Sequence, residues 1–146
     1  MKRFVIASSL ALLFASTAAN AADNRIEMPM QELLASQEAR DAGIDGSVRF
    51  FLAGQSHPRV ASRHGEGVSN RRTNGVGKSD EESCRRAALS ALLAFQKSAQ
   101  ARGANAVVDI TSYFKRNTFS SPTHYECHAG GVMSAVTLKG TYATIP

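Results

Sequence analysis

The chain of 146 residues has only two cysteines, Cys84 and Cys127, and they lie far apart in the sequence. Redox-active proteins usually carry a closely spaced Cys-X-X-Cys pair instead. Beyond the N-terminal segment there is no second long apolar run and no internal repeat. No serine, cysteine or carboxylate pair is placed by a motif beside a catalytic partner. The sequence therefore predicts no catalytic residue, no cofactor and no further membrane span.

The N-terminus carries the three parts of a secretory signal peptide. Met1-Lys2-Arg3 is basic, the apolar run FVIASSLALLFASTAA follows, and Ala19-Asn20-Ala21 places small residues where a signal peptidase reads them. A retained membrane anchor is the alternative, but serines interrupt the run, which is short for a bilayer span of about 20 apolar residues. We expect cleavage after Ala21, no lipid anchor because no cysteine follows, and a soluble periplasmic or secreted product.

Residues 22–146 suit a single domain with its own core. Lys2 and Arg3 are two of the 17 basic residues, whereas all 12 acidic residues follow the predicted signal peptide, so the mature segment has a net charge of +3. This charge permits contact with an acidic surface without requiring one. Both cysteines belong to the mature segment, and an even number in an oxidising compartment predicts one structural disulfide, Cys84–Cys127.

Periodicity and capping residues predict two helices. A short amphipathic helix is expected over residues 29–41, with Gly43 ending it. The stronger helix begins with a capping box formed by Ser79 and Glu82 and ends at Gly103. Its apolar residues recur at helical spacing and share one buried face, which consists of Cys84, Ala88, Leu92, Phe95 and Ala99.

Four strands are expected around these helices, over residues 47–53, 106–114, 123–128 and 132–142. Alternation in the second of them predicts one apolar face made of Ala106, Val108, Ile110 and Phe114. The predicted fold class is α+β, with one long helix packed on a mainly antiparallel sheet of about four strands and a short helix before it.

Residues 54–77 are rich in Gly, Ser, Asn and Arg and poor in large apolar residues, which is typical of a loop, with a short hairpin through residues 59–63 and 68–73 as an alternative. The loop and its border supply a candidate basic binding loop, which consists of Arg59, Arg63, Arg71, Arg72 and Lys78. Such a loop is either simply solvated or contacts anionic lipid headgroups, glycan phosphate or nucleic acid. Little aromatic interleaving is present for base stacking, so nucleic acid is not the expected partner.

The segment Asn74-Gly75-Val76-Gly77-Lys78-Ser79 resembles the end of a phosphate-binding loop. The motif requires an earlier glycine at the position that Arg72 occupies. A bulky side chain at that bend opposes the wrapping of backbone N–H groups around a phosphate. We interpret the segment as a turn and helix cap, with phosphate or nucleotide binding by Lys78 and Ser79 as the alternative.

His124, Cys127 and His128 lie close together and suggest a metal site. If Cys127 belongs to the disulfide, only two ligands remain, too few for a closed zinc site. On one strand His124 and His128 would also be about 13 Å apart. We therefore expect histidines that face solvent or form hydrogen bonds, and no bound metal.

The segments TNGVGKSDEESC, GANAVVDI and HYECHAGGVMSAVTLKG, with the signal peptide, resemble a group of small exported bacterial proteins often labelled "excinuclease ATPase subunit". The label echoes the NGVGKS fragment and implies no demonstrated DNA repair activity. The chain is more distantly similar to the periplasmic domain of the envelope-stress sensor RcsF, which has a cysteine early in a helix, a Gly-Ala-Asn-Ala segment before a strand and a later strand cysteine. This resemblance implies a disulfide-stapled sheet-and-helix fold and a binding or sensing role.

These observations favour a noncatalytic periplasmic module for binding, envelope maintenance or sensing. Its expected partner is an envelope protein or an anionic envelope surface. The alternative is a phosphate- or nucleotide-binding protein that uses Lys78 and Ser79. Nucleotide binding that requires Mg²⁺ would favour the alternative.

Overall fold

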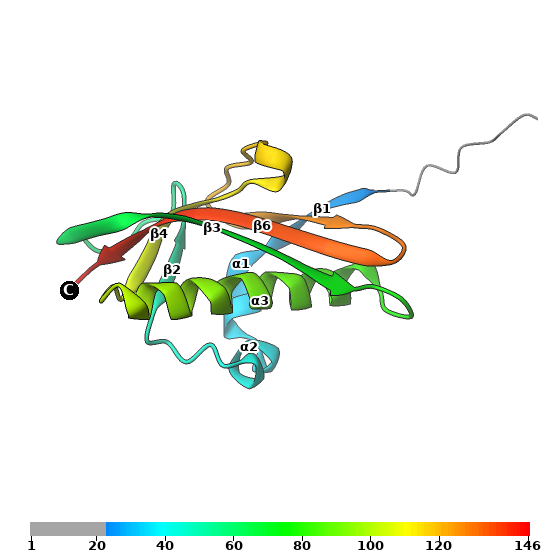
Figure 1. Ribbon diagram of the computed structural model, residues 1–146, viewed down its shortest axis with the longest axis horizontal. Helices are drawn as coiled ribbons and strands as arrows, with labels where there is room; N and C mark the ends of the chain where they lie inside the picture. Colours follow the sequence, from blue (N-terminus) through cyan, green and yellow to red (C-terminus); the bar gives the residue numbers. More distant parts are fainter. Residues whose placement is uncertain (1–22) are drawn as a thin grey trace, which may run out of the picture.

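The computed structural model describes residues 23–146, so the predicted signal peptide and its cleavage site lie outside the described residues. One sheet of six strands carries the long helix α3 across one face (Figure 1). The predicted α+β class and the long helix are confirmed, but the prediction of about four strands is wrong. The elements are, in chain order, β1 (Asn24–Pro29), α1 (Met30–Ala35), α2 (Gln37–Ala42), β2 (Arg49–Leu52), β3 (Ser62–Asn74), α3 (Asp80–Ala101), β4 (Ala106–Ser112), the 3-10 turn η1 (Phe114–Arg116), β5 (His124–Ala129) and β6 (Met133–Thr144).

Strand β6 is the centre of the sheet. Along one edge it pairs antiparallel with β3 from Met133 to Thr144. Its other edge is shared, because β4 pairs with its C-terminal half and β5 pairs with Ser134 and Ala135. Beyond these strands, β1 pairs antiparallel with β5, and β2 pairs in parallel with β4. The sheet is therefore mixed, with the order β1-β5-β6-β4-β2 and β3 on the second edge of β6.

Residues 62–74 form the long strand β3 rather than the predicted loop or short hairpin. Two hydroxyls of this strand bind the backbone of α3, because Ser69 Oγ donates to Ala91 O at 2.9 Å and Thr73 Oγ1 donates to Ser83 O at 2.8 Å. Pairing with β6 satisfies the backbone, so tertiary contacts override a composition that is poor in strand-forming side chains. The polar composition of residues 62–74 suggested a loop, but a strand at the edge of a sheet can form from polar residues because it buries little apolar surface.

The N-terminal region also differs from the prediction. The helix expected over residues 29–41 is two short helices that meet at Ser36, whose Oγ accepts a hydrogen bond from Ala39 N at 3.1 Å and caps α2. Gly43 ends α2 in the left-handed conformation, with a φ of 101°, as expected. The strand β1, which precedes α1, was not predicted.

Helix α3 follows the sequence closely. Ser79 Oγ accepts a hydrogen bond from Glu82 N at 3.1 Å, so Ser79 is the N-cap, while the Glu82 carboxylate pairs with Arg86 at 3.1 Å. Gly103, just past the helix, has a φ of 70°. The predicted apolar face is buried, and Cys84 at its start is joined to Cys127 of β5 by the predicted disulfide, with the two Cα atoms 5.8 Å apart.

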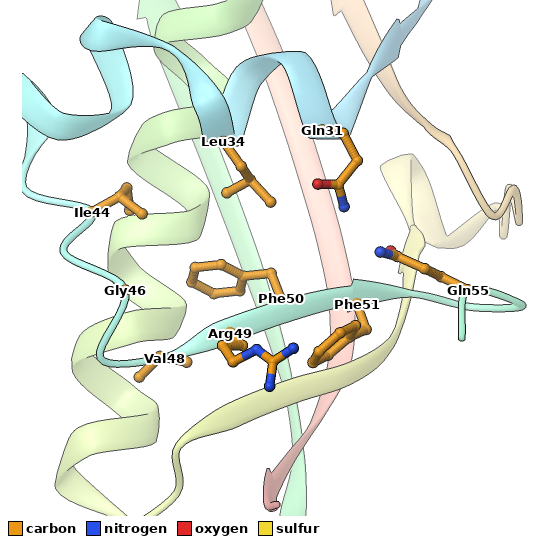
Figure 2. A pocket seen from close by; sticks show the side chains of 9 residues that line it. All are labelled: Gln31, Leu34, Ile44, Gly46, Val48, Arg49, Phe50, Phe51 and Gln55. Carbon is orange, nitrogen blue, oxygen red and sulfur yellow. The ribbon is translucent and has the colours of Figure 1, made fainter. Parts of the chain in front are cut away.

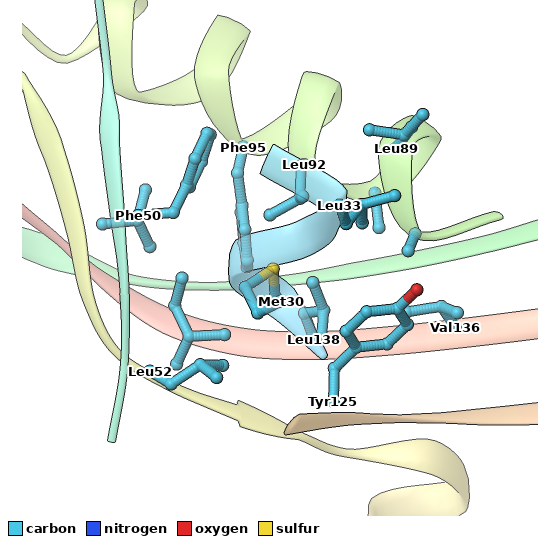
Figure 3. Close-up of a cluster of buried hydrophobic side chains, with 14 of the residues drawn as sticks. Met30, Leu33, Phe50, Leu52, Leu89, Leu92, Phe95, Tyr125, Val136 and Leu138 are labelled. Carbon is cyan, nitrogen blue, oxygen red and sulfur yellow. The ribbon is translucent and has the colours of Figure 1, made fainter. Parts of the chain in front are cut away.

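The main core lies between α3 and the sheet, with α1 completing it (Figure 3). Tyr125 of β5 is the largest fully buried side chain, and burial raises the pKa of its phenol. Figure 3 shows side chains of α1 lying between α3 and the strands. The core residues labelled in Figure 3 include Met30, Leu33, Leu92, Phe95, Tyr125 and Leu138.

A bulge in β4 changes which side chains face this core. Asp109 has a φ of 55°, and the register with β6 shifts between Val108 and Thr111. Ile110 faces α3, whereas Ala106 and Val108 belong to a smaller apolar cluster with Phe51, Ala143 and Ile145. The predicted common face of Ala106, Val108 and Ile110 is therefore wrong, because the extra residue reverses the alternation.

Candidate functional site

The side of the sheet opposite α3, called the open face below, carries part of the predicted basic set. Arg63 and Arg72 both belong to β3, but nine intervening steps along a strand separate them by roughly 30 Å. Arg63 pairs with Asp109 of β4 at 3.3 Å. Arg71 and Arg72 are adjacent and therefore point to opposite sides of the strand. The structure thus divides the predicted basic loop, with Arg59 before β3 and Lys78 in the turn before α3.

A cavity of about 280 Å³ on the open face, called the open-face pocket, brings basic side chains from separate elements together. Arg72 comes from β3, Lys115 from η1 and His128 from β5. Of the five predicted basic residues, Arg72 alone lines this cavity. Lys115 was missed because residues 115–122 lay between two predicted strands and were read only as their connection. The complete lining is Asp23, Arg72, Phe114, Lys115, His128, Gly130, Met133 and Ala135.

One wall of the open-face pocket is an ordered polar network. The side chain of Glu126 is 7% exposed. Its carboxylate accepts a hydrogen bond from Arg25 Nε at 2.7 Å and contacts His128 Nε2 at 2.5 Å. The other ring nitrogen, His128 Nδ1, lies 3.2 Å from Asp23 Oδ2. The hydrogen bond with Glu126 also raises the pKa of the Arg25 guanidinium.

The ring of His128 is fixed from a second direction. Phe114 stacks on it, with ring centroids 3.7 Å apart and an interplanar angle of 16°. The next two residues, Lys115 and Arg116, are exposed and have left-handed φ values of 51° and 64°. Side chains other than glycine rarely adopt this conformation, and it is retained where surrounding contacts fix the backbone. The stacked pair therefore holds η1 over the open face, from which this loop projects (Figure 1).

The NGVGKS segment forms a closed turn. Asn74 Oδ1 accepts from Val76 N at 2.9 Å, Gly75 N donates to Val132 O at 2.8 Å, and Lys78 N donates to Gly75 O at 3.1 Å. The first turn of α3 adds three carboxylates, from Asp80, Glu81 and Glu82. Engaged N–H groups and nearby negative charge both oppose phosphate binding here.

The predicted histidine–cysteine group is separated by its partners. His124 Nδ1 lies 2.8 Å from Thr123 Oγ1, Cys127 belongs to the disulfide, and His128 contacts two carboxylates. Within residues 23–146 no group of three or more His, Cys, Asp or Glu side chains is arranged to hold a metal ion. These histidines take part in hydrogen bonds, as the sequence suggested.

A second cavity, called the edge pocket, lies beside the short strand β2 and has a volume of about 360 Å³ (Figure 2). Side chains of α1 and of the α2–β2 connection form one side of it, and β2 forms the other. No motif pointed to this cavity, because it depends on how α1 packs beside the end of the sheet. Its lining is Gln31, Leu34, Ile44, Gly46, Val48, Arg49, Phe50, Phe51 and Gln55.

Comparison of the chain with protein family models, curated proteins and solved structures found no match. Of the helices in residues 23–146, none combines the length and apolar character needed to cross a membrane. The Cys84–Cys127 disulfide is of the kind that persists in oxidising compartments.

Proposed function

We propose that this protein is an exported, noncatalytic binding module whose open-face pocket takes an anionic group of the cell envelope. The observation that carries the proposal is the meeting of Arg72 and Lys115 in one cavity beside His128. Neither Arg72 nor Lys115 forms an ion pair with another residue of the described part of the chain. Asp23 also lines this cavity, but its carboxylate contacts His128. Arg72 and Lys115 are thus left without a carboxylate partner, which favours an anionic ligand.

The polar network gives this pocket a fixed wall. Glu126 and Asp23 hold His128, and Phe114 stacks on the imidazole ring, so the cations flank a preorganised surface. A rigid site loses less conformational entropy on binding than a flexible loop does. Lys115 and Arg116 of η1 are exposed, so a charged surface can reach them.

Export and sensing remain part of the proposal. The signal-peptide pattern, the disulfide and the resemblance to small exported proteins and to RcsF support an envelope location. A mature net charge of +3 suits an anionic partner. A phosphate or nucleotide site at Lys78 and Ser79 has less support, since carboxylates surround the start of α3.

Vesicle sedimentation tests the proposal with the mature protein, residues 22–146. Vesicles rich in phosphatidylglycerol should retain the protein, and phosphatidylcholine vesicles should not. Binding should weaken as salt is raised, because exposed charges are screened within about 10 Å at 0.1 M ionic strength. A parallel titration with glycerol phosphate, without vesicles, distinguishes two sources of the anionic group. Saturable binding of glycerol phosphate would indicate that the pocket recognises a free phosphate group. Binding to vesicles alone would indicate that it requires a lipid surface.

Matched variants locate the binding site. Lys115→Gln and Arg72→Gln should each weaken retention, whereas Lys97→Gln, on the exposed side of α3, removes the same charge far from the open face. Equal losses in Lys97→Gln and Lys115→Gln would mean that net charge alone drives the contact. Failure of both vesicles and glycerol phosphate to bind would reject the proposed function.

A further inference from the structure

The outer edge of β2 has no neighbouring strand among residues 23–146. This strand is at one end of the sheet, and in the described part of the chain its one partner strand is β4. The N–H groups of Arg49 and Ala53 point toward β4, where they donate to Asn105 O at 3.0 Å and Ile110 O at 2.9 Å. Successive peptide groups of a strand point to opposite sides. The N–H and C=O of Phe50 therefore point away from the sheet.

Leu52 shows how an outward-pointing peptide group of β2 can be satisfied. Its N–H donates to Gln55 Oε1 at 3.0 Å, and its carbonyl accepts from Gln55 N at 3.0 Å. Gln55 thus occupies the position that a neighbouring strand would take. Within residues 23–146 nothing gives Phe50 a comparable outer partner. One peptide group of this edge is satisfied, and the next one along the same edge, that of Phe50, is unpaired within the described residues.

The edge pocket lies beside this strand edge, with Phe50 among its lining residues. Leu34, Ile44 and Val48 supply apolar walls on the side of the strand that faces the core. Gln31 and Gln55 lie at the same end of the pocket, with their amide groups directed toward it (Figure 2). An extended backbone needs edge hydrogen bonds and pockets for alternate side chains. The edge pocket offers both.

Arg49 gives the edge a charge. It is exposed on the opposite side of β2 from Phe50, its guanidinium lies 5.1 Å from the Phe51 ring centroid, and it forms no ion pair within the described residues. We propose that the β2 edge binds an extended segment of another protein, which adds a strand beside Phe50. Its alternate side chains are apolar and enter the edge pocket, and an acidic side chain on its other face pairs with Arg49. This site is separate from the open-face pocket.

A peptide titration tests this proposal with the ¹⁵N-labelled mature protein. The probe is acetyl-Thr-Val-Asp-Val-Thr-Val-Lys-amide, in a panel that moves the aspartate through the polar positions. The Phe50 amide should shift and become protected from exchange. N-methylation of the central valine should weaken binding about tenfold, because it removes one edge hydrogen bond and leaves its partner unpaired. If no panel member perturbs Phe50 at millimolar concentration, the proposal is wrong.

A charge exchange provides the control. Arg49→Glu should weaken the aspartate peptide and strengthen its lysine analogue, while Arg59→Glu, an exposed site outside the pocket, should leave both affinities unchanged. Equal effects of the two variants would reject a specific role for Arg49. Sedimentation adds a further outcome, because a dimer that protects Phe50 without peptide would assign the edge to a second copy of this chain and overturn the proposal.

Discussion

Glu126 and His128 occupy alternate positions of β5 and point to the same side of the sheet, where the carboxylate contacts His128 Nε2 at 2.5 Å. Arg25 of β1 approaches the same carboxylate from the neighbouring strand at 2.7 Å. Glu126 is buried, and Arg25 and His128 are the hydrogen-bond partners of its carboxylate. The network therefore attaches the edge strand β1 to β5 and shapes one wall of the open-face pocket.

Removing the Glu126 charge should destabilise the fold. Glu126→Gln leaves Arg25 and His128 without their shared partner, and we expect the free energy of unfolding to fall by about 1–3 kcal/mol. Glu27→Gln is the matched control, since Glu27 pairs with the same arginine at 3.0 Å but is 45% exposed. Exposed pairs contribute about 0–1 kcal/mol. Equal losses in urea melts of the two variants would contradict a structural role for the buried carboxylate.

The Cys84–Cys127 disulfide should contribute a large share of the free energy of unfolding. It closes a separation of 43 residues, and removing such a bridge typically costs about 2–5 kcal/mol in a small secreted domain. Cys84→Ser and Cys127→Ser should each show this loss, and the double variant should lose no more than either one. Mass spectrometry of a non-reduced digest of exported protein should find the two peptides joined. Two free thiols would contradict the assignment.

Gly67 tests the pairing of β3 with β6. A Cβ at this position would overlap the Tyr142 ring, which is directed toward α3 from the adjacent strand. Gly67→Ala should therefore lower stability by about 1–3 kcal/mol through overpacking. Gly131→Ala, in the β5–β6 turn with open space around its Cβ, should change stability much less. Matching melting curves would mean that β3 lies in another register.

The start of α3 separates a helix cap from a phosphate loop. Ser79→Ala should lower the free energy of unfolding by about 0.5–2 kcal/mol, because it removes the acceptor for Glu82 N. Lys78→Ala should change stability by less than about 0.5 kcal/mol. Calorimetry with ATP and Mg²⁺ should detect no specific binding to the mature protein. Micromolar binding that Lys78→Ala abolishes would restore the nucleotide hypothesis.

The parts of the fold that sequence predicted are those set by local chemistry. Ser79 and Gly103 fix the ends of α3, and the spacing from Cys84 to Ala99 fixes its buried face. These signals act within one or two helical turns, so a single sequence contains them. The disulfide could also be predicted from the sequence, because two cysteines allow only one pairing within the chain.

The parts that sequence missed depend on distant partners. β3 is a strand because β6 supplies its hydrogen bonds, although its own residues read as a loop. The bulge at Asp109 reverses a pattern that strict alternation would continue. The open-face pocket arises in the same way, since Arg72, Lys115 and His128 meet only when three separate elements assemble. No spacing along the chain encodes that meeting.

The most direct test of the open-face site is where an anion binds. In a titration of the ¹⁵N-labelled mature protein with glycerol phosphate, we predict that amide shifts will concentrate at Arg72, Lys115 and His128, and that Lys115→Gln will suppress them. The amides of Gly75, Val76 and Lys78 should not move, because each already donates a hydrogen bond and three carboxylates follow this turn. Shifts confined to Gly75–Ser79, with the open face unchanged, would contradict the account.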